Sequence, residues 1–382
     1  MERRKDGARS CGDWFGSQKG TPLVTNEEAL HPFSAGEQLA LESIVERLVA
    51  EQAVAGAVAG VWIAGRGAWT HAHGIGNVQT AAPMTVDDHF RIASVTKTFV
   101  ATVVLQLVDE GTLSLDDTLE QFVPGIPNGE RITVRQVLGM TAGIVNYIND
   151  PAFEEAYTTN PLMPFAPREA VEIVKRYPPD FPPGEKVQYS DTNYILAGLI
   201  IEAVAGVSAA EAISSRILEP LGLTGTSFPD TPKMPMPFPR GYGADPGSAD
   251  VRDITESNPD VAWTAGAMIS TLDDLRVWGR ALAEGTLLSA ETQRERLRFA
   301  ALPAAPGFEL GYGLGIMRLN GFLGHAGAIF GYSTWMLHST EEDATIVVLA
   351  NRGETETEFA SKIAVDIAHQ LFPERFPRDA SA

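Results

Sequence analysis

The sequence predicts an α/β (α+β) fold in which an antiparallel sheet is flanked by helices and an inserted, mostly α domain interrupts the chain. Two observations predict it. Strand-like apolar runs occur toward both ends of the chain, and the stretch between them reads as helices separated by loops rich in proline and glycine. Because chain ends tend to lie close together, we expect the two strand-bearing parts to form one discontinuous sheet.

The N-terminal part is polar and rich in glycine before it becomes periodic. Residues 1–33 show no periodicity and predict a flexible tail. Apolar residues at helical spacing then predict a helix over 35–52. Ser34 is a plausible N-cap for it, and Glu37 three residues later completes a capping box.

The remaining elements follow from apolar residues at helical spacing and from strand-like apolar runs. The other predicted helices are 94–111, 193–205, 272–285 and 357–372. The predicted strands are 57–64 and 68–74, which form a hairpin, and 311–319, 331–338 and 344–351. Together they define a tail (1–33), an α/β domain (34–113 plus 262–375) and an α-rich domain (114–261).

Composition narrows the classes of function. The chain has 382 residues, with 29 Lys plus Arg against 49 Asp plus Glu, so its formal net charge is −20. This balance argues against nucleic acid, whose phosphates need basic surfaces, and against anionic membrane surfaces. The single cysteine, Cys11, excludes an intramolecular disulfide and a cysteine-rich metal site.

The sequence also predicts a location. No apolar segment follows the basic residues near the N-terminus, so the sequence as given has no signal peptide. The longest apolar run, Ala53–Gly65, is too short to span a bilayer as a helix. We therefore expect a cytoplasmic protein with no integral membrane segment, or an exported one if the true start or signal is missing.

The sequence lacks the motifs of several common classes of enzyme. The sequence has no Gly-x-Ser-x-Gly, no Walker A lysine loop, no Gly-x-Gly-x-x-Gly and no His-Glu-x-x-His. Of seven histidines only His71 and His73 are close, and they would share one face of a strand. Without a third ligand nearby in the sequence, two half-exposed strand residues are the simpler interpretation. We expect no metal and no cofactor.

The segment Ser94-Val95-Thr96-Lys97 opens the strongest predicted helix. Residues three apart lie on the same helix face, about one turn apart. A helix N-terminus disfavours a protonated lysine, and burial does the same, so Lys97 could be neutral and take the proton of Ser94. Such a pair also arises by chance, so its weight depends on what accompanies it.

Two further segments carry candidate chemistry. Tyr189 and Asp191 precede a predicted helix, and a tyrosine beside a lysine can lose its proton more easily and relay it, although a capping turn is the plain alternative. Gly324-His325-Ala326-Gly327-Ala328 is a strand-like run of small residues. It could admit a substrate backbone, with His325 bonded to a substrate carbonyl or to the relay, but tight strand pairing would need the same small residues.

The three segments, in this order and at this spacing, resemble the serine β-lactamase-like family, which includes class C β-lactamases, D-alanyl-D-alanine carboxypeptidases and family VIII esterases. The resemblance covers about residues 35–372 and implies the β-lactamase and penicillin-binding-protein fold. The segments that carry it are Phe90–Lys97, Leu113–Asp117, Ile132–Leu138, Thr141–Gly143, Trp263–Gly266, Ser270–Leu275 and Gly324–Tyr332.

The resemblance also implies a covalent serine mechanism. Ser94 would be the nucleophile, and Lys97 would be its general base or the proton partner of Tyr189, which would pass a proton to the leaving group. The backbone N–H groups of Ser94 and Ala328 would form the oxyanion hole. The substrate-binding residues would be Tyr147, Asp191, Trp263, Met317, His325, Ala326, Gly327 and Tyr332.

The chain departs from the family's pattern at three positions. Asp191 stands where an asparagine is usual; an ionised carboxylate cannot donate a hydrogen bond, and it would raise the pKa of a nearby lysine. Ala326 lacks a hydroxyl that can hold a substrate carboxylate. Met317 stands where similar carboxypeptidases often have an arginine, and Arg318 would point to the other face of the strand. These losses favour an ester or amide without that carboxylate.

Four functions stay open on the sequence alone. The leading hypothesis is a serine hydrolase that forms an acyl-enzyme from an ester or amide. The alternatives are an acyltransferase with an amine or alcohol acceptor, a D-alanyl-D-alanine carboxypeptidase and a catalytically silent penicillin-binding sensor. Hydrolysis and transfer share their first step, so the same residues predict both. The expected partner is a small-molecule ester, amide or peptide, and the oligomeric state is not defined.

Overall fold

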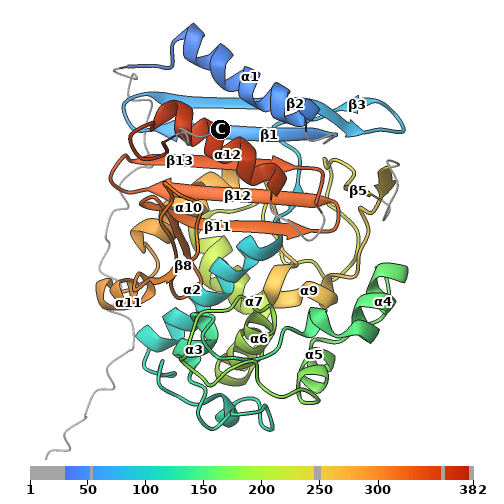
Figure 1. Cartoon of the computed structure of the whole chain (residues 1–382), viewed down its shortest axis with the longest axis vertical. Coiled ribbons are helices and arrows are strands. Elements are labelled where there is room, and N and C mark those ends of the chain that lie inside the picture. The colour runs from blue at the N-terminus through green and yellow to red at the C-terminus, as the bar shows by residue number, and fades with distance from the viewer. Residues whose placement is uncertain (1–30, 52–54, 245–250, 354–357, 378–382) are drawn as a thin grey trace, which may run out of the picture.

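The structure is a computed structural model that describes residues 31–51, 55–244, 251–353 and 358–377. In Figure 1 a broad sheet fills one half of the molecule and a group of helices fills the other. The predicted fold class, an antiparallel sheet flanked by helices with a mostly helical insertion, is confirmed.

The main sheet has nine strands in the order β3-β2-β1-β13-β12-β11-β10-β9-β8. Every neighbouring pair is antiparallel. Strand β1 pairs with β13, so strands from opposite ends of the chain lie side by side, as expected. The strands are β1 Gly56–Ile63, β2 Gly67–Asn77, β3 Ala82–Pro83, β8 Ala300–Leu302, β9 Leu310–Tyr312, β10 Met317–Leu319, β11 Phe322–Ile329, β12 Tyr332–Ser339 and β13 Ala344–Ala350.

Helices cover both faces of this sheet. Helices α1 (Ala35–Glu51) and α12 (Glu358–Leu371) cross one face, which Figure 1 shows in blue and red. Helix α10 (Leu272–Glu284) packs on β12 and β13. Along β13 the side chains alternate: Ile346 and Val348 join the core under α1 and α12, and Val347 and Leu349 join the core on the α10 side. Both faces of β13 are therefore buried, which explains why Thr345 is its only polar residue.

The second half of the molecule is built around a buried helix, α2 (Thr96–Asp109). It packs on α6 (Thr192–Ala205), which ends at Gly206 with φ of 70°. The prediction assigned α2 to the α/β domain, but its largest packing partners are helices of the insertion, because it is apolar on nearly every side. The other helices are α3 Val134–Leu138, α4 Pro151–Thr159, α5 Pro167–Val174, α7 Ala209–Ile213, α8 Glu219–Leu221, α9 Pro259–Gly266 and α11 Ala290–Arg296.

Most sequence-predicted elements occur with bounds shifted by a few residues, and the Ser34–Glu37 capping box forms. Two details differ from the expectation. The run 311–319 is two strands, β9 and β10, because Gly315 adopts φ of 71° in a tight turn. The mostly helical insertion contains one short strand pair, β5 Tyr242–Ala244 with β6 Val251–Asp253, and a second short pair, β4 Phe90–Arg91 with β7 Ile269–Ser270, lies outside it in the α/β part.

The predicted tail falls on residues 1–30, outside the described part of the chain, and on 31–33, which are folded. Phe33 is buried in the core beneath α1, and the Arg66 guanidinium lies 4.6 Å above the centre of its ring. Among the described residues no single helix has the length and hydropathy to cross a membrane, whereas α6 and the segment Ala209–Leu221, bent by 80°, pass that test only as a pair.

Candidate active site

Ser94 lies where the sheet half meets the helical half. It sits in a 3-10 turn, Ala93–Val95, that leads directly into α2. Ala93 adopts φ of 47°, a left-handed conformation that is unfavourable for a residue with a side chain. The buried helix that follows and strand β11 hold this turn in place. The Ser94 side chain lines a cavity at the N-terminal end of α2.

Lys97 follows one helical turn later and is fully buried. Its Nζ lies 2.9 Å from Ser94 Oγ, 2.6 Å from Asp191 Oδ1 and 2.7 Å from the carbonyl oxygen of Ala265. Burial lowers the pKa of Lys97, and the carboxylate of Asp191 acts in the opposite direction. The predicted influence of Asp191 therefore exists, but burial outweighs it, and Lys97 is poised to be a proton acceptor.

Tyr189 is the second neighbour of the serine. Its hydroxyl donates a hydrogen bond to Ser94 Oγ at 2.7 Å, and Lys97 Nζ lies 4.9 Å from the centre of its ring. Burial raises the pKa of Tyr189 well above its ordinary value, and the charge of Asp191 raises it further. The residue is 44% exposed, so solvent moderates this shift without reversing it. The pKa of Tyr189 is therefore shifted in the direction opposite to the one expected from a neighbouring lysine, and in this structure its hydroxyl donates to Ser94 Oγ.

Asp191 occupies the N-cap position of α6, but its side chain does not cap the helix. One carboxylate oxygen binds Lys97, and the other accepts a hydrogen bond from Asn146 Nδ2 at 3.3 Å. Asn146 Oδ1 is buried and has no hydrogen-bond partner among the described residues, although it borders the cavity. The sequence analysis missed Asn146. Its signal was its position three residues after the Thr141–Gly143 segment.

Strand β11 forms the opposite wall. A Cβ added at Gly327 would lie 2.4 Å from the carbonyl oxygen of Ile92 and 3.0 Å from Ser94 N, so only glycine lets the strand approach the serine turn this closely. Ala328 follows directly and lines the cavity. This approach brings the backbone beside Ser94 N, the position that the predicted oxyanion hole requires.

His325 lines the cavity with both ring nitrogens occupied. Nδ1 contacts the carbonyl oxygen of Ala326, and Nε2 lies 3.2 Å from the hydroxyl of Tyr312. Burial lowers the pKa of His325 to about 3, so the ring is neutral: Nδ1–H donates and Nε2 accepts from Tyr312. The predicted hydrogen bond from His325 to a substrate carbonyl therefore has no free donor in this structure. Tyr312, which the sequence analysis did not single out, holds the ring instead.

The cavity around Ser94 has a volume of about 920 Å³. Its charged lining side chains, among the described residues, are the carboxylates Glu154 and Asp191, and no lysine or arginine borders it. Tyr147 lines it with its ring, while its hydroxyl donates to the carbonyl of Val261. Further lining residues are Asn149, Phe153, Tyr157, Val261, Leu302, Phe308, Leu310, Met317, Leu319, Ala326, Ile329, Phe330 and Trp335.

Three predicted substrate-binding residues do not line this cavity. The Tyr332 hydroxyl donates to the carbonyl of Pro239, which turns the buried side chain toward the loop before β5. Trp263 is buried at a kink in α9, where φ is 37°, and packs close to Gly198 of α6. Gly327 contributes backbone only, behind the serine turn. Gly327 and Trp263 still shape the site indirectly. Gly327 lets β11 approach the serine turn, and the kink at Trp263 comes two residues before Ala265, whose carbonyl oxygen binds Lys97.

The two neighbouring residues of β10 face opposite ways, as predicted. Met317 lines the cavity. Arg318 places its guanidinium 4.8 Å above the centre of the Phe299 ring and is absent from the lining. The place where an arginine would hold a substrate carboxylate therefore carries a thioether.

A serine next to a buried lysine and a tyrosine, at the junction of an antiparallel sheet and a helical insertion, is the arrangement of a penicillin-recognising type of serine hydrolase. Comparison with known proteins agrees. The family model described as Beta-lactamase matches residues 41–370, and the chain belongs to this family of serine hydrolases.

Individual solved structures and curated relatives show which members of this family the chain resembles. A D-stereospecific amidohydrolase from Streptomyces sp. is 33% identical, covers 88% of this chain and 99% of that chain, and superposes with a TM-score of 0.76. The D-amino acid amidase from Ochrobactrum anthropi SV3, complexed with L-phenylalanine amide, is 26% identical with a TM-score of 0.77 and the same coverage. The D-aminopeptidase of Brucella anthropi is 27% identical over 332 residues, which are 85% of this chain and 61% of that protein.

Proposed function

We propose that the protein is an amidase that forms an acyl-enzyme on Ser94 and acts on amides whose acyl part carries a free amino group. The charge of the cavity supports this most directly. The described residues that line it include two carboxylates and no arginine or lysine. Such a site favours a cationic or neutral substrate and disfavours a carboxylate.

Acylation follows from the contacts of Ser94. When Lys97 is neutral, its two protons serve Asp191 Oδ1 and the Ala265 carbonyl. Its lone pair is then free to accept the proton of Ser94, whose Oγ lies 2.9 Å from Nζ. Ser94 Oγ then forms a bond to the substrate carbonyl carbon, and the oxyanion binds backbone N–H groups of Ser94 and Ala328. The leaving nitrogen departs with a proton from Tyr189, whose raised pKa keeps it protonated until that point. The products are an ester on Ser94 and a free amine or ammonia.

Turnover uses the same groups again. The proton on Lys97 restores Tyr189, which returns Lys97 to its neutral form. A water molecule then attacks the ester carbon and gives one proton to Lys97. When the intermediate collapses, Ser94 Oγ leaves and takes that proton back from Lys97, 2.9 Å away, so the acid is released and both residues return to their starting forms. This assignment makes Lys97 the base and Tyr189 the acid in acylation, a choice that the sequence left open. It rests on the two opposite pKa shifts and on the hydrogen bond that the Tyr189 hydroxyl donates to Ser94 Oγ.

The acyl side of the substrate is limited by the groups around Asn146. Asp191 is already paired with Lys97, so Asn146 Oδ1 and Glu154 on α4 are the acceptors left for a substrate ammonium. Phe153, Tyr157 and Phe330 supply an apolar wall for a side chain. An amino acid amide with an aromatic side chain has both features. The relatives named D-stereospecific amidohydrolase and D-amino acid amidase support the D configuration.

The remaining hypotheses predict other properties. A D-alanyl-D-alanine carboxypeptidase would need a group for the terminal carboxylate, and Met317 and Ala326 supply none. A silent penicillin-binding sensor would not need Lys97 and Tyr189 both bonded to the serine. An acyltransferase would share the acylation step and differ only in its acceptor, so it is separated by experiment.

The test compares rates on D-phenylalanine amide, L-phenylalanine amide, N-acetyl-D-phenylalanine amide and a peptide ending in D-Ala-D-Ala. We expect the highest kcat/KM on the first. Acetylation removes the positive charge, and we expect it to lower kcat/KM at least about fivefold, which corresponds to about 1 kcal/mol for one exposed ion pair. An added amine acceptor should not increase consumption of the amide.

Glu154→Gln provides the matched test of charge, with Glu155→Gln as its control. Glu155 is the next residue of α4 and does not line the cavity. We expect the preference for the free amine to shrink in Glu154→Gln and to persist in Glu155→Gln. Equal rates with and without the amino group, or faster release of D-Ala from the peptide, would contradict the proposed substrate. Acceleration by the acceptor would point to acyl transfer.

A further inference from the structure

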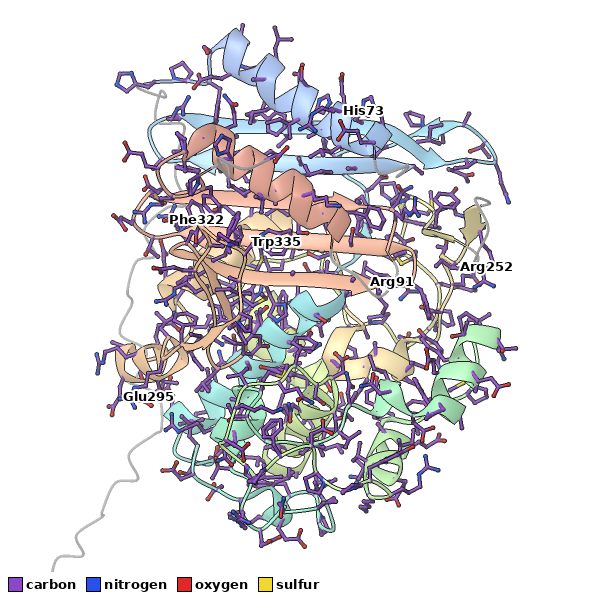
Figure 2. The ribbon with its side chains drawn as sticks, in the orientation of Figure 1. His73, Arg91, Arg252, Glu295, Phe322 and Trp335 are labelled. Atoms are coloured by element: carbon purple, nitrogen blue, oxygen red, sulfur yellow. The ribbon has the colours of Figure 1, made fainter. Side chains whose placement is uncertain are left out.

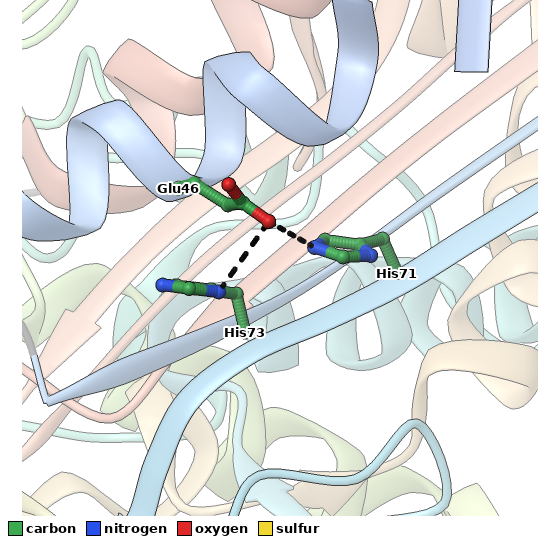
Figure 3. A group of neighbouring side chains, drawn as sticks. All are labelled: Glu46, His71 and His73. Atoms are coloured by element: carbon green, nitrogen blue, oxygen red, sulfur yellow. Dashed lines mark ion pairs between the residues drawn. The ribbon is translucent and has the colours of Figure 1, made fainter. Parts of the chain in front are cut away.

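A second cluster of reactive side chains lies at the other edge of the sheet. His71 and His73 project from one face of β2, and Glu46 reaches them from α1 (Figure 3). Figure 2 shows His73 beside α1, away from Trp335, which borders the active-site cavity. We propose that these three residues form a binding site for one divalent transition-metal ion, of which Zn²⁺ is the best match.

The ligand atoms are already gathered. Glu46 Oε1 lies 3.9 Å from His71 Nε2 and 3.8 Å from His73 Nδ1, and all three atoms lie within 4.8 Å of one another. Tetrahedral zinc with bonds of about 2.0–2.2 Å separates its ligand atoms by about 3.3–3.5 Å. The Glu46 side chain is 51% exposed, so it has room to rotate toward the two histidines.

The histidine rings are held in an orientation that suits a ligand. Trp69, His71 and His73 stack along β2, with ring centres 6.0 Å and 6.2 Å apart and planes 17° and 14° from parallel. His71 Nε2 is a buried atom with no hydrogen-bond partner among the described residues. A bound cation would satisfy its lone pair. This unpartnered atom, which faces a carboxylate at ion-pair distance, is what separates the cluster from ordinary surface histidines.

The donor set selects the kind of metal. Two imidazole nitrogens and one carboxylate oxygen match Zn²⁺, and they match Ni²⁺ and Cu²⁺ less specifically. Mg²⁺ and Ca²⁺ prefer oxygen ligands only. With three protein ligands, water would complete the coordination shell. The sequence suggested no metal because Glu46 lies on a helix 25 residues before His71, and only folding brings it near.

The site is distant from the serine. Strand β2 is separated from β11 by β1, β13 and β12. At about 4.8 Å per strand the two sites are about 19 Å apart. The ion would therefore join α1 to the edge of the sheet and would not take part in acylation. Binding to the folded state alone would raise the unfolding temperature.

The experiment titrates Zn²⁺ into the chelator-treated full chain by calorimetry, with Mg²⁺ in parallel. We expect one equivalent of Zn²⁺, no measurable Mg²⁺ binding, and a Zn²⁺-dependent rise in unfolding temperature. His71→Ala and Glu46→Gln should each weaken Zn²⁺ binding by at least about 100-fold, because loss even of an outer-shell partner typically costs about 10–100-fold. Ester or amide turnover should be unchanged in both.

His31→Ala is the matched control, since this exposed histidine contacts the turn at Gly65 through its backbone and not the cluster. It should retain full Zn²⁺ affinity. Glu46→Gln lies on the exposed side of α1, so it tests the site even if His71→Ala does not fold. Wild-type affinity in either variant, or binding of Mg²⁺ in place of Zn²⁺, would overturn the proposal.

Discussion

Two clusters of titratable side chains occupy opposite parts of the sheet and differ in burial and spacing. Around Ser94, polar atoms lie 2.6–2.9 Å apart and Lys97 is fully buried. Around Glu46 they lie 3.8–3.9 Å apart, and the Glu46 side chain is 51% exposed. Ser94, Lys97 and Asp191 are joined by direct hydrogen bonds, whereas His71 Nε2 has no hydrogen-bond partner among the residues that the structure describes.

The difference shows what desolvation contributes. Burial shifts the pKa of Lys97 down and that of Tyr189 up, so a base and an acid stand on either side of one hydroxyl. Near the surface, solvent screens the carboxylate–imidazole pairs, and the groups stay available to an external ion. We therefore propose proton transfer for the buried cluster and ion binding for the exposed one.

The largest effect should follow from Lys97→Met. Removal of the proton acceptor of Ser94 is expected to lower kcat/KM by about 10²–10⁴-fold. It also leaves the mostly buried Asp191 carboxylate without its closest hydrogen-bond donor, which should lower the free energy of unfolding by about 3 kcal/mol. Urea denaturation and steady-state kinetics measure the two losses. The double variant Lys97→Met with Asp191→Asn should regain much of the stability and none of the activity.

Tyr189→Phe separates the effect on turnover from the effect on the free energy of unfolding. The Tyr189 hydroxyl has Ser94 Oγ as its hydrogen-bond partner, so its loss should leave the unfolding free energy almost unchanged. Turnover of an amide should fall by about 10²–10⁴-fold, because a poor leaving group needs the proton. An activated phenyl ester, whose leaving group needs none, should be affected less. Equal losses on both substrates would remove Tyr189 from the role of acid.

Asp191→Asn tests whether the charge of Asp191 influences the pKa of Lys97. Lys97 must be neutral to accept a proton, so activity should rise as pH passes upward through its pKa. The Asp191 charge raises that pKa, and its removal should therefore move the rising limb of the kcat/KM profile to lower pH. A limb that moves to higher pH, or does not move, would mean that Lys97 is not the group observed.

The smallest effect is expected in the second cluster without metal. His71→Ala removes one partner of a solvent-accessible pair, so the free energy of unfolding of the metal-free protein should change by less than about 0.5 kcal/mol. Chemical denaturation in the presence of a chelator measures it. A loss comparable to that of Lys97→Met would show that this cluster is a structural core element.

Periodicity and capping predicted most of the fold. The hairpin of β1 and β2, the helices from α1 to α12 that carry long apolar stripes, and the return of the last strands to the first were visible because each is a local pattern repeated over many residues. The placement of α2 in the α/β domain stays a prediction, because a helix buried over most of its surface has no apolar stripe that shows which half of the molecule it joins. The short β5–β6 pair was too brief for alternation to register.

The site residues also divide into those that a local sequence pattern predicts and those that it does not. Ser94, Lys97 and Tyr189 were found because short motifs carry them, and the structure brings them together. Asn146, the Ala265 carbonyl and Tyr312 were missed because each reaches the site only through tertiary contact. Trp263 and Tyr332 were misplaced because a backbone kink and a hydrogen bond to Pro239 turn them away from the cavity. A short motif identifies which residues belong to the site, whereas the direction in which a side chain points depends on tertiary packing.

The most direct test of the account is whether Ser94 becomes acylated. Intact-protein mass spectrometry after brief incubation with an activated short-chain ester should show one added acyl group, located on the peptide that contains Ser94. Ser94→Ala should show none, and Ser190→Ala, a change at a buried serine beside Tyr189, should still be labelled. An adduct that persists in Ser94→Ala, or that maps to another residue, would contradict the assignment of Ser94 as the nucleophile.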